Sequence, residues 1–72
     1  MKLREVIRTR TGRYVMIDTC YTWDHGWETM VFACNERGEV IDWRSLDMEN
    51  YETQTGAAMG HDGMVKKWRE RR

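Results

Sequence analysis

Residues 14–34 read YVMIDTCYTWDHGWETMVFAC, and this stretch decides the fold. On both sides of the polar, glycine-ended segment Thr22–Gly26, residues rich in β-branched and aromatic side chains follow a period of two. That period is typical of half-buried β-strands, and a short polar loop joins two such strands as a hairpin. The stretch therefore predicts two antiparallel strands, Tyr14–Tyr21 and Trp27–Cys34.

The segments on either side extend this hairpin. Leu3–Thr9 alternates in the same way, and Thr11–Arg13 supplies a turn before the next strand. Asn35–Gly38 is a good four-residue turn, and Glu39–Arg44 follows it as a fourth strand. Such short connections leave no room for crossover helices, so the four strands are expected to form an antiparallel meander.

The periodicity changes near the end of the chain. One helical face collects Ala57, His61, Met64, Val65 and Trp68. Thr53 or Thr55 can cap the start of this helix. Gly56, Gly60 and Gly63 weaken it by about 1 kcal/mol each relative to alanine, so the helix must depend on packing across the sheet. Gly56 and Gly60 are expected to allow a close approach of backbone.

These patterns predict an α+β fold: a four-stranded antiparallel meander with one C-terminal helix packed on the sheet. Residues 1–72 would form a single ββββα domain. The predicted core comprises Ile7, Val15, Ile17, Val31, Trp43, Met64, Val65 and Trp68. Trp23 lies in the hairpin loop, where it can hardly be fully buried.

Composition narrows the classes of protein. The chain has 72 residues, with 12 basic and 12 acidic side chains and a formal net charge of zero. This length allows one small core, and the neutral total argues against a uniformly basic nucleic-acid binder. A hydrophobic content of 40% is too high for a disordered chain. Neither a membrane-spanning run nor a signal peptide is recognisable, so we expect a cytoplasmic protein.

The charge is segregated along the chain. Residues 1–13 and residues 64–72 each carry five basic side chains and one acid. The fifty residues between them hold ten acids against Arg37 and Arg44, a net charge of −8. If the two basic ends meet in space, the molecule has one positive and one negative face.

A longer pattern runs through the second half of the chain. Its elements are Glu28-Thr29-Met30-Val31-Phe32, Gly38, Val40, Asp42-Trp43, Leu46-Asp47, Tyr51, Thr53, Gly60-His61, Met64-Val65 and Trp68. This pattern resembles a group of short phage and prophage accessory proteins. The chain departs from it at Gln54–Gly56, where acidic residues are expected in the first helical turn. The resemblance implies a phage accessory gene, and small phage proteins often inhibit host defence, especially CRISPR nucleases.

A metal site is the sharpest chemical hypothesis. Zinc-ligand types occur at Cys20, Asp24, His25, Cys34 and His61. Centring the hairpin on Thr22–Gly26, however, sets Cys20 opposite Glu28 and Cys34 opposite Tyr14. The two cysteines would then lie roughly 20 Å apart at 3.4 Å per residue. We therefore expect reduced, packed thiols, and no metal or other cofactor is predicted.

Catalysis is not predicted either. Only Cys34 and His61 could be proposed as a nucleophile and base, and a lone histidine on an apolar helix face is more often a hydrogen-bonded core residue. The chain contains no glycine-rich phosphate loop, HExxH or GxSxG motif.

Binding to a macromolecule accounts for more features of the sequence than a metal site or catalysis does. Tryptophan and arginine are enriched at binding hot spots, and the chain has four tryptophans. Candidate partner-binding residues are Trp23 and Asp24 in the loop, the acidic side chains Asp42, Asp47, Glu49 and Glu52, and the arginines Arg4, Arg8 and Arg10. The three arginines are expected to share one face of the first strand, where they could line a phosphate backbone or simply protect a sheet edge.

The sequence thus favours a phage-encoded inhibitor that occupies a host defence protein or its nucleic-acid complex. One alternative is an oligomeric sponge that traps a signalling nucleotide at an interface of arginine and tryptophan. Another is a small nucleic-acid-binding accessory protein. A homodimer is expected, because so small a domain gains stability by sharing apolar surface and because basic ends can face an acidic middle.

Overall fold

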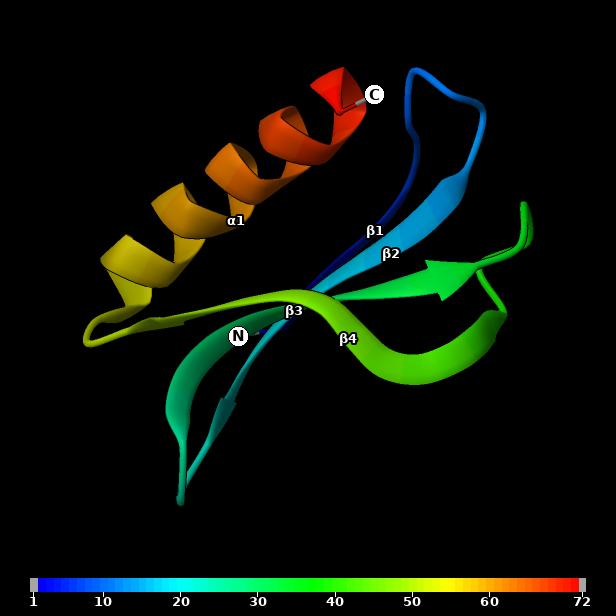
Figure 1. Cartoon of the computed structure of the whole chain (residues 1–72). Coiled ribbons are helices and arrows are strands. Elements are labelled where there is room, and N and C mark those ends of the chain that lie inside the picture. Colours follow the sequence, from blue (N-terminus) through cyan, green and yellow to red (C-terminus); the bar gives the residue numbers. More distant parts are fainter. Residues whose placement is uncertain (1, 72) are drawn as a thin grey trace.

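The computed structural model describes residues 2–71, and its four strands form one antiparallel sheet in the order β1-β2-β3-β4. A single helix crosses one face of that sheet (Figure 1). The elements are β1 (Lys2–Arg8), β2 (Tyr14–Thr22), β3 (Gly26–Cys34), β4 (Val40–Tyr51) and α1 (Gln54–Glu70). The predicted α+β architecture is confirmed.

The hairpin register agrees with the sequence prediction. Cys20 pairs with Glu28 and Cys34 pairs with Tyr14, so the two cysteines lie at opposite ends of the β2–β3 ladder. Gly26 closes the hairpin with a φ of +71°, a backbone conformation that glycine adopts at little cost.

The fourth strand is longer than predicted. It runs to Tyr51 rather than ending at Arg44. Its pairing with β3 is interrupted. Ala33 pairs with Asp42 and Val31 pairs with Asp47, so the four residues Trp43–Leu46 lie opposite a single residue of β3, Phe32. This bulge shifts the alternation by several residues, so the second half of β4 does not continue the period of the first.

The face of the sheet under α1, called here the inner face, holds the main core. Seven predicted core residues are buried together in one cluster: Ile7, Val15, Ile17, Val31, Met64, Val65 and Trp68. The prediction for Trp43 was wrong, since this side chain is 73% exposed. Trp43 lies in the β4 bulge and packs edge-on against Phe32, whose neighbours Val31 and Ala33 belong to the inner face.

The helix begins and packs as its sequence indicates. The Oγ1 atom of Thr53 accepts a hydrogen bond from the Gly56 N–H at 2.9 Å, which makes Thr53 the N-cap. All five residues of the predicted apolar face are buried. At Gly60 the Tyr51 ring lies so close that a Cβ atom would stand 2.1 Å from Cζ. A close approach at Gly60 is present, but the neighbour is the Tyr51 ring and not the backbone that the sequence led us to expect.

A buried polar chain runs beside the apolar core on the inner face. His61 is 1% exposed, and its Nε2 lies 3.1 Å from Oε1 of Glu5. Its Nδ1 lies 2.6 Å from Oγ1 of Thr19, which in turn lies 2.5 Å from Oγ1 of Thr29. A carboxylate only accepts, so Nε2 of His61 donates to Glu5, and Nδ1 forms the hydrogen bond with the Thr19 hydroxyl. His61 is therefore a hydrogen-bonded core residue.

Within residues 2–71, no helix combines the length and the apolar character that crossing a membrane requires.

Candidate functional site

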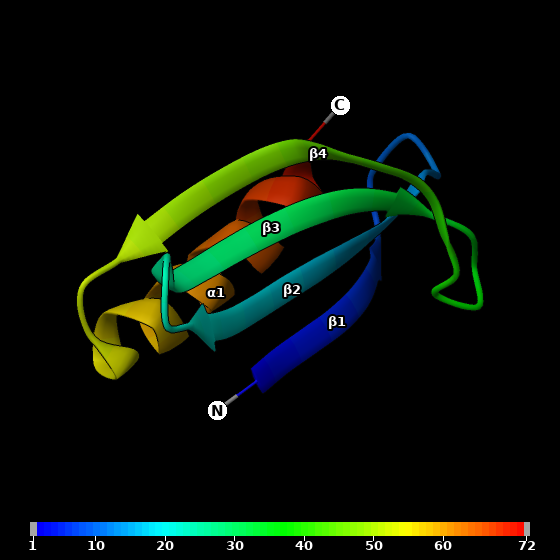
Figure 2. The same ribbon diagram turned by 90° about the horizontal axis from the view of Figure 1, so that it is seen from below.

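The face of the sheet opposite α1, called here the outer face, is turned toward the viewer in Figure 2, with the helix behind the strands. Strand pairing sets Val6 beside Met16 and Met16 beside Phe32, so these side chains form one row across three strands. The Trp43 ring extends the row, with its centroid 5.2 Å from that of Phe32. Met48 joins from the neighbouring row, where it pairs with Met30. We call Val6, Met16, Phe32, Trp43 and Met48 the outer patch.

The turn between β3 and β4 covers one part of the outer face. Asn35 holds this turn, because its Oδ1 accepts hydrogen bonds from the backbone N–H groups of Arg37 and Glu39, each at 3.0 Å. Gly38 then adopts a φ of +83° and comes so near Val6 that a Cβ atom would stand 2.8 Å from Cγ2. The turn thus reaches across the sheet to β1.

The outer patch is buried at its centre and exposed at its border. Met16 and Phe32 are buried, whereas Trp43 and Met48 are 73% and 50% exposed. Ile41 and Leu46, which flank Trp43 in β4, are also exposed. A hollow of about 380 Å³ adjoins this region, lined by Gly12, Arg13, Tyr14, Ala33, Cys34 and Ile41. A rigid centre with exposed apolar side chains around it is typical of an interaction surface.

One charged pair borders the outer patch on the sheet, and a second flanks Trp43 along β4. Nη2 of Arg4 lies 3.4 Å from Oδ2 of Asp18, which stands in the same row as Met30 and Met48. On β4 the guanidinium of Arg44 and its backbone N–H both donate to Asp42. These hydrogen bonds lower the pKa of the Asp42 carboxyl. Both signs of charge therefore meet at this surface.

The predicted acidic contact residues do not lie together in the structure. Asp47 accepts hydrogen bonds from Nζ of Lys67 at 2.6 Å and from Nε1 of Trp68 at 3.1 Å, and so joins β4 to α1. Partial burial raises the pKa of Asp47, but hydrogen bonds from Lys67, from Trp68 and from the Met48 N–H outweigh it and hold the pKa below its ordinary value. Asp42 and Glu52 lie elsewhere, Asp42 with Arg44 and Glu52 exposed after β4.

Glu49 also has a partner on the helix side. It accepts a hydrogen bond from the Tyr51 hydroxyl at 2.8 Å. Burial, and next the bond to Glu49, raise the pKa of Tyr51 to about 12. Asp47 and Glu49 therefore serve contacts within the molecule.

The remaining predicted contact residues lie at two other places. Trp23, 89% exposed, and Asp24 occupy the β2–β3 turn, at the other end of β3 from the β3–β4 turn. Arg4 and Arg8 share the outer face of β1, whereas Arg10 lies beyond the end of that strand. The expectation that all three arginines share one strand face was wrong, because β1 ends at Arg8.

The candidate metal ligands are not brought together. Cys20 and Cys34 lie far apart on the outer face, His25 lies in the β2–β3 turn, and His61 lies on α1, facing the inner face of the sheet. Residues 2–71 contain no group of three or more potential metal-ligating side chains. Cys34 and His61 are on opposite sides of the sheet, and burial raises the pKa of the Cys34 thiol, so the two do not form a nucleophile–base pair.

Comparisons with known proteins add no further assignment: no family model matches the chain, and no curated protein or solved structure shows significant similarity to it.

The outer patch itself was missed at the sequence level. A signal for it exists, because Met16 and Phe32 are large apolar residues in the phase opposite to Ile17 and Val31. Apolar residues in both phases of adjacent strands indicate a sheet with two apolar faces.

Proposed function

We propose that this protein acts without catalysis, by docking its outer patch onto a host defence protein inside the cell. The observation that carries the proposal is the position of Trp43, which is 73% exposed while its ring rests edge-on against the buried Phe32. A large aromatic side chain held on a rigid support is the kind of residue that dominates binding energy at protein interfaces.

The surroundings of Trp43 support a protein partner. Exposed Met48, Leu46 and Ile41 supply apolar area on the same strand. Methionine adapts its shape to a partner surface, which suits a docking face. The bordering pair Arg4–Asp18 provides charges of both signs at short range. Such a border favours a partner surface that is itself mixed in charge.

The target follows from the resemblance to phage accessory proteins. We propose an RNA-guided CRISPR nuclease as the first target, because small phage proteins of this kind often inhibit such enzymes. Occupying the nuclease, alone or with its bound nucleic acid, would block access of the target DNA.

The test mixes the protein with a guide-loaded nuclease and measures co-elution and DNA cleavage. The wild-type protein is expected to co-elute and to suppress cleavage. Trp43→Ser should weaken inhibition at least about thirtyfold, as expected for a hot-spot residue worth about 2 kcal/mol or more. Trp23 was a contact candidate on the sequence, but it lies at the other end of β3, outside the outer patch. Trp23→Ser is therefore the matched control, and docking through the outer patch predicts that it leaves inhibition within about twofold.

Two results would contradict the proposal. One is the absence of both a complex and inhibition across several classes of guide-loaded nuclease. The other is an equal loss of inhibition in Trp43→Ser and Trp23→Ser, because that outcome would remove the assignment to the outer patch.

A further inference from the structure

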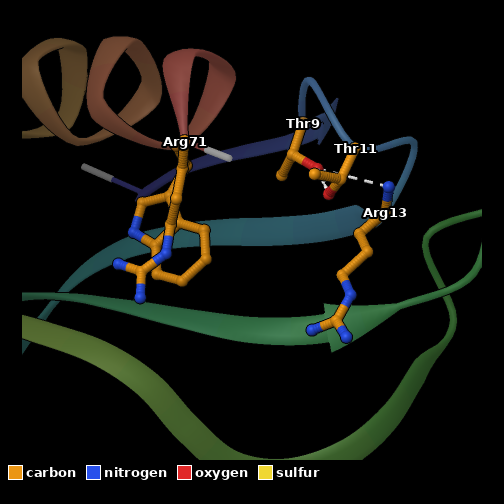
Figure 3. Close-up of a pocket in the computed structure, with 5 residues that line it drawn as sticks. Thr9, Thr11, Arg13 and Arg71 are labelled. Carbon is orange, nitrogen blue, oxygen red and sulfur yellow. Dashed lines mark hydrogen bonds between the residues drawn. The ribbon is translucent and has the colours of Figure 1, made fainter.

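A hollow of about 330 Å³ lies between the β1–β2 turn and the C-terminal end of α1, and Arg13 separates it from the hollow beside the outer patch. Thr9, Thr11, Arg13, Trp68 and Arg71 line the first of these hollows. In Figure 3 the Arg13 side chain extends from the β1–β2 turn and the Arg71 side chain from the end of the helix, side by side and both toward the strands. The fold thus places Arg13, the last residue of the first basic segment, beside Arg71 of the C-terminal basic segment.

Within the part of the chain that the structure describes, the arginines in this hollow have no acidic partner. Among residues 2–71, no carboxylate lies within 4.0 Å of the guanidinium of Arg13 or Arg71. Lys67, one helical turn before Arg71, is by contrast paired with Asp47 at 2.6 Å. Two unpaired guanidinium groups at one hollow favour an anion between them, and the guanidinium fork matches phosphate geometry. The dipole of α1 places only about half a negative charge at its C-terminal end, which is less than the positive charge of the two guanidinium groups.

The two threonines orient a hydroxyl for the same anion. Oγ1 of Thr9 accepts a hydrogen bond from the Arg13 N–H at 3.2 Å and lies 3.1 Å from Oγ1 of Thr11. When the buried Thr9 donates to Thr11, the hydroxyl hydrogen of the exposed Thr11 is free to donate to a bound oxygen. Figure 3 shows these bonds as dashed lines within the turn.

Trp68 and Arg71 define the remaining wall. The guanidinium carbon of Arg71 lies 4.5 Å from the centroid of the Trp68 ring, a cation–π contact that holds the guanidinium plane in place. Trp68 is buried, so its ring supports Arg71 instead of offering a free stacking face. The outer side of the Arg71 plane is then available to a flat group, since guanidinium planes stack on nucleobases.

From this arrangement we infer that the hollow binds a nucleotide through its phosphate group. Arg13, Arg71 and the Thr11 hydroxyl would contact the phosphate, and Arg71 would also stack against the base. A volume of about 330 Å³ is at the low end of the roughly 300–1,000 Å³ found for small-molecule sites, which suits one nucleotide unit. That unit can be a free nucleotide or one residue of a single strand. The inference is independent of the docking function proposed above.

The experiment titrates the full chain with adenosine 5′-monophosphate, with adenosine and with a single-stranded deoxyadenosine decamer. Binding is followed by the NMR signals of the Trp68 indole N–H and the Arg13 backbone N–H. The monophosphate should shift both signals, whereas adenosine should not. If only the monophosphate binds, the ligand is a free nucleotide; if the decamer binds at least as tightly, the site takes a strand. Either result supports the inference.

Variants separate this site from general attraction of anions. Arg13→Ala and Arg71→Ala should each raise the Kd about tenfold, as expected when one charge-assisted hydrogen bond is lost. Arg71→Lys, which keeps the charge but not the plane, should fall between wild type and Arg71→Ala. Arg37→Ala removes an exposed arginine from the β3–β4 turn and should change the Kd less than twofold. Circular dichroism checks that each variant is folded.

Three outcomes would overturn the inference. They are no shift of the two signals at millimolar monophosphate, equal binding of adenosine and the monophosphate, and an Arg37→Ala effect as large as that of Arg13→Ala.

Discussion

The two faces of one sheet have contrasting surroundings. On the inner face, α1 covers the strands, and even the polar side chains of Thr19, Thr29 and His61 are buried with hydrogen-bond partners. On the outer face, only a turn and the β4 bulge lie over the strands, and Trp43 and Met48 remain exposed. Apolar content alone therefore does not define the core of this protein. The element that covers a face decides whether its side chains stabilise the fold or remain available to a partner.

The largest expected difference between the faces is in the free energy of unfolding that is lost when a side chain is shortened to alanine. Ile17→Ala should lower the free energy of unfolding by about 2–5 kcal/mol, because this side chain is 0% exposed beneath α1. Met48→Ala, on the outer face and half exposed, should lower it by less than about 1 kcal/mol. Urea unfolding of both variants measures the contrast, and similar losses would mean that the outer face is also core.

The contact between α1 and Tyr51 gives the next largest effect. Gly60→Ala would place a Cβ atom 2.1 Å from Cζ of Tyr51, so the ring or the helix must shift, with an expected loss of about 1–3 kcal/mol. In a Tyr51→Ala background the same substitution should instead stabilise the helix by about 1 kcal/mol. A thermal unfolding cycle of the four proteins tests this, and a loss that persists without Tyr51 would contradict the assignment.

Asp47 links the helix to β4, and its contribution should depend on pH. Its pKa is lower in the folded protein than its ordinary value of 3.8, so its stabilisation is complete above that value and is lost as the pH falls through the folded pKa. Asp47→Asn should cost about 1–2 kcal/mol at neutral pH. The unfolding free energies of wild type and variant should converge below about pH 4, and a constant difference down to pH 2 would exclude this role.

The smallest effect on stability is expected at Trp43. Trp43→Ser should change the free energy of unfolding by less than about 1 kcal/mol, because the side chain is mostly exposed. If the expected homodimer forms through the outer face, however, this variant should sediment as a monomer while the wild type dissociates only at high salt. A wild-type monomer at both low and high salt, at high micromolar concentration, would contradict self-association.

Local patterns were sufficient to predict most of the fold. The period of two in Tyr14–Cys34 determined the hairpin register, and the period of the last segment identified the buried face of α1 from Ala57 to Trp68. The second half of β4 could not be predicted, because the bulge at Trp43–Leu46 breaks the alternation that defines a strand. The misplacement of Trp43 in the core follows from the same break.

The proposed binding surfaces were less predictable from the sequence, because tertiary contacts create them. The hollow at Arg13 and Arg71 joins the β1–β2 turn to the end of α1, and no spacing along the chain records their meeting. The segregation of basic residues at both ends indicated only that such a meeting would concentrate positive charge. The outer patch depends on where the helix packs, and both faces of β2 and β3 carry apolar side chains that a helix could cover.

The bulge in β4 also affects how copies of the protein can meet. β4 is an edge strand, and a long regular edge offers its free backbone groups to another molecule, which can extend the sheet without limit. Here the free edge of β4 is interrupted at Trp43–Leu46, so a second chain would find only short stretches of regular backbone on either side. The opposite edge, β1, carries the basic side chains of Lys2, Arg4 and Arg8, which repel a second copy of itself. The same irregularity that displays Trp43 thus interrupts the edge along which a second copy could extend the sheet into a fibre.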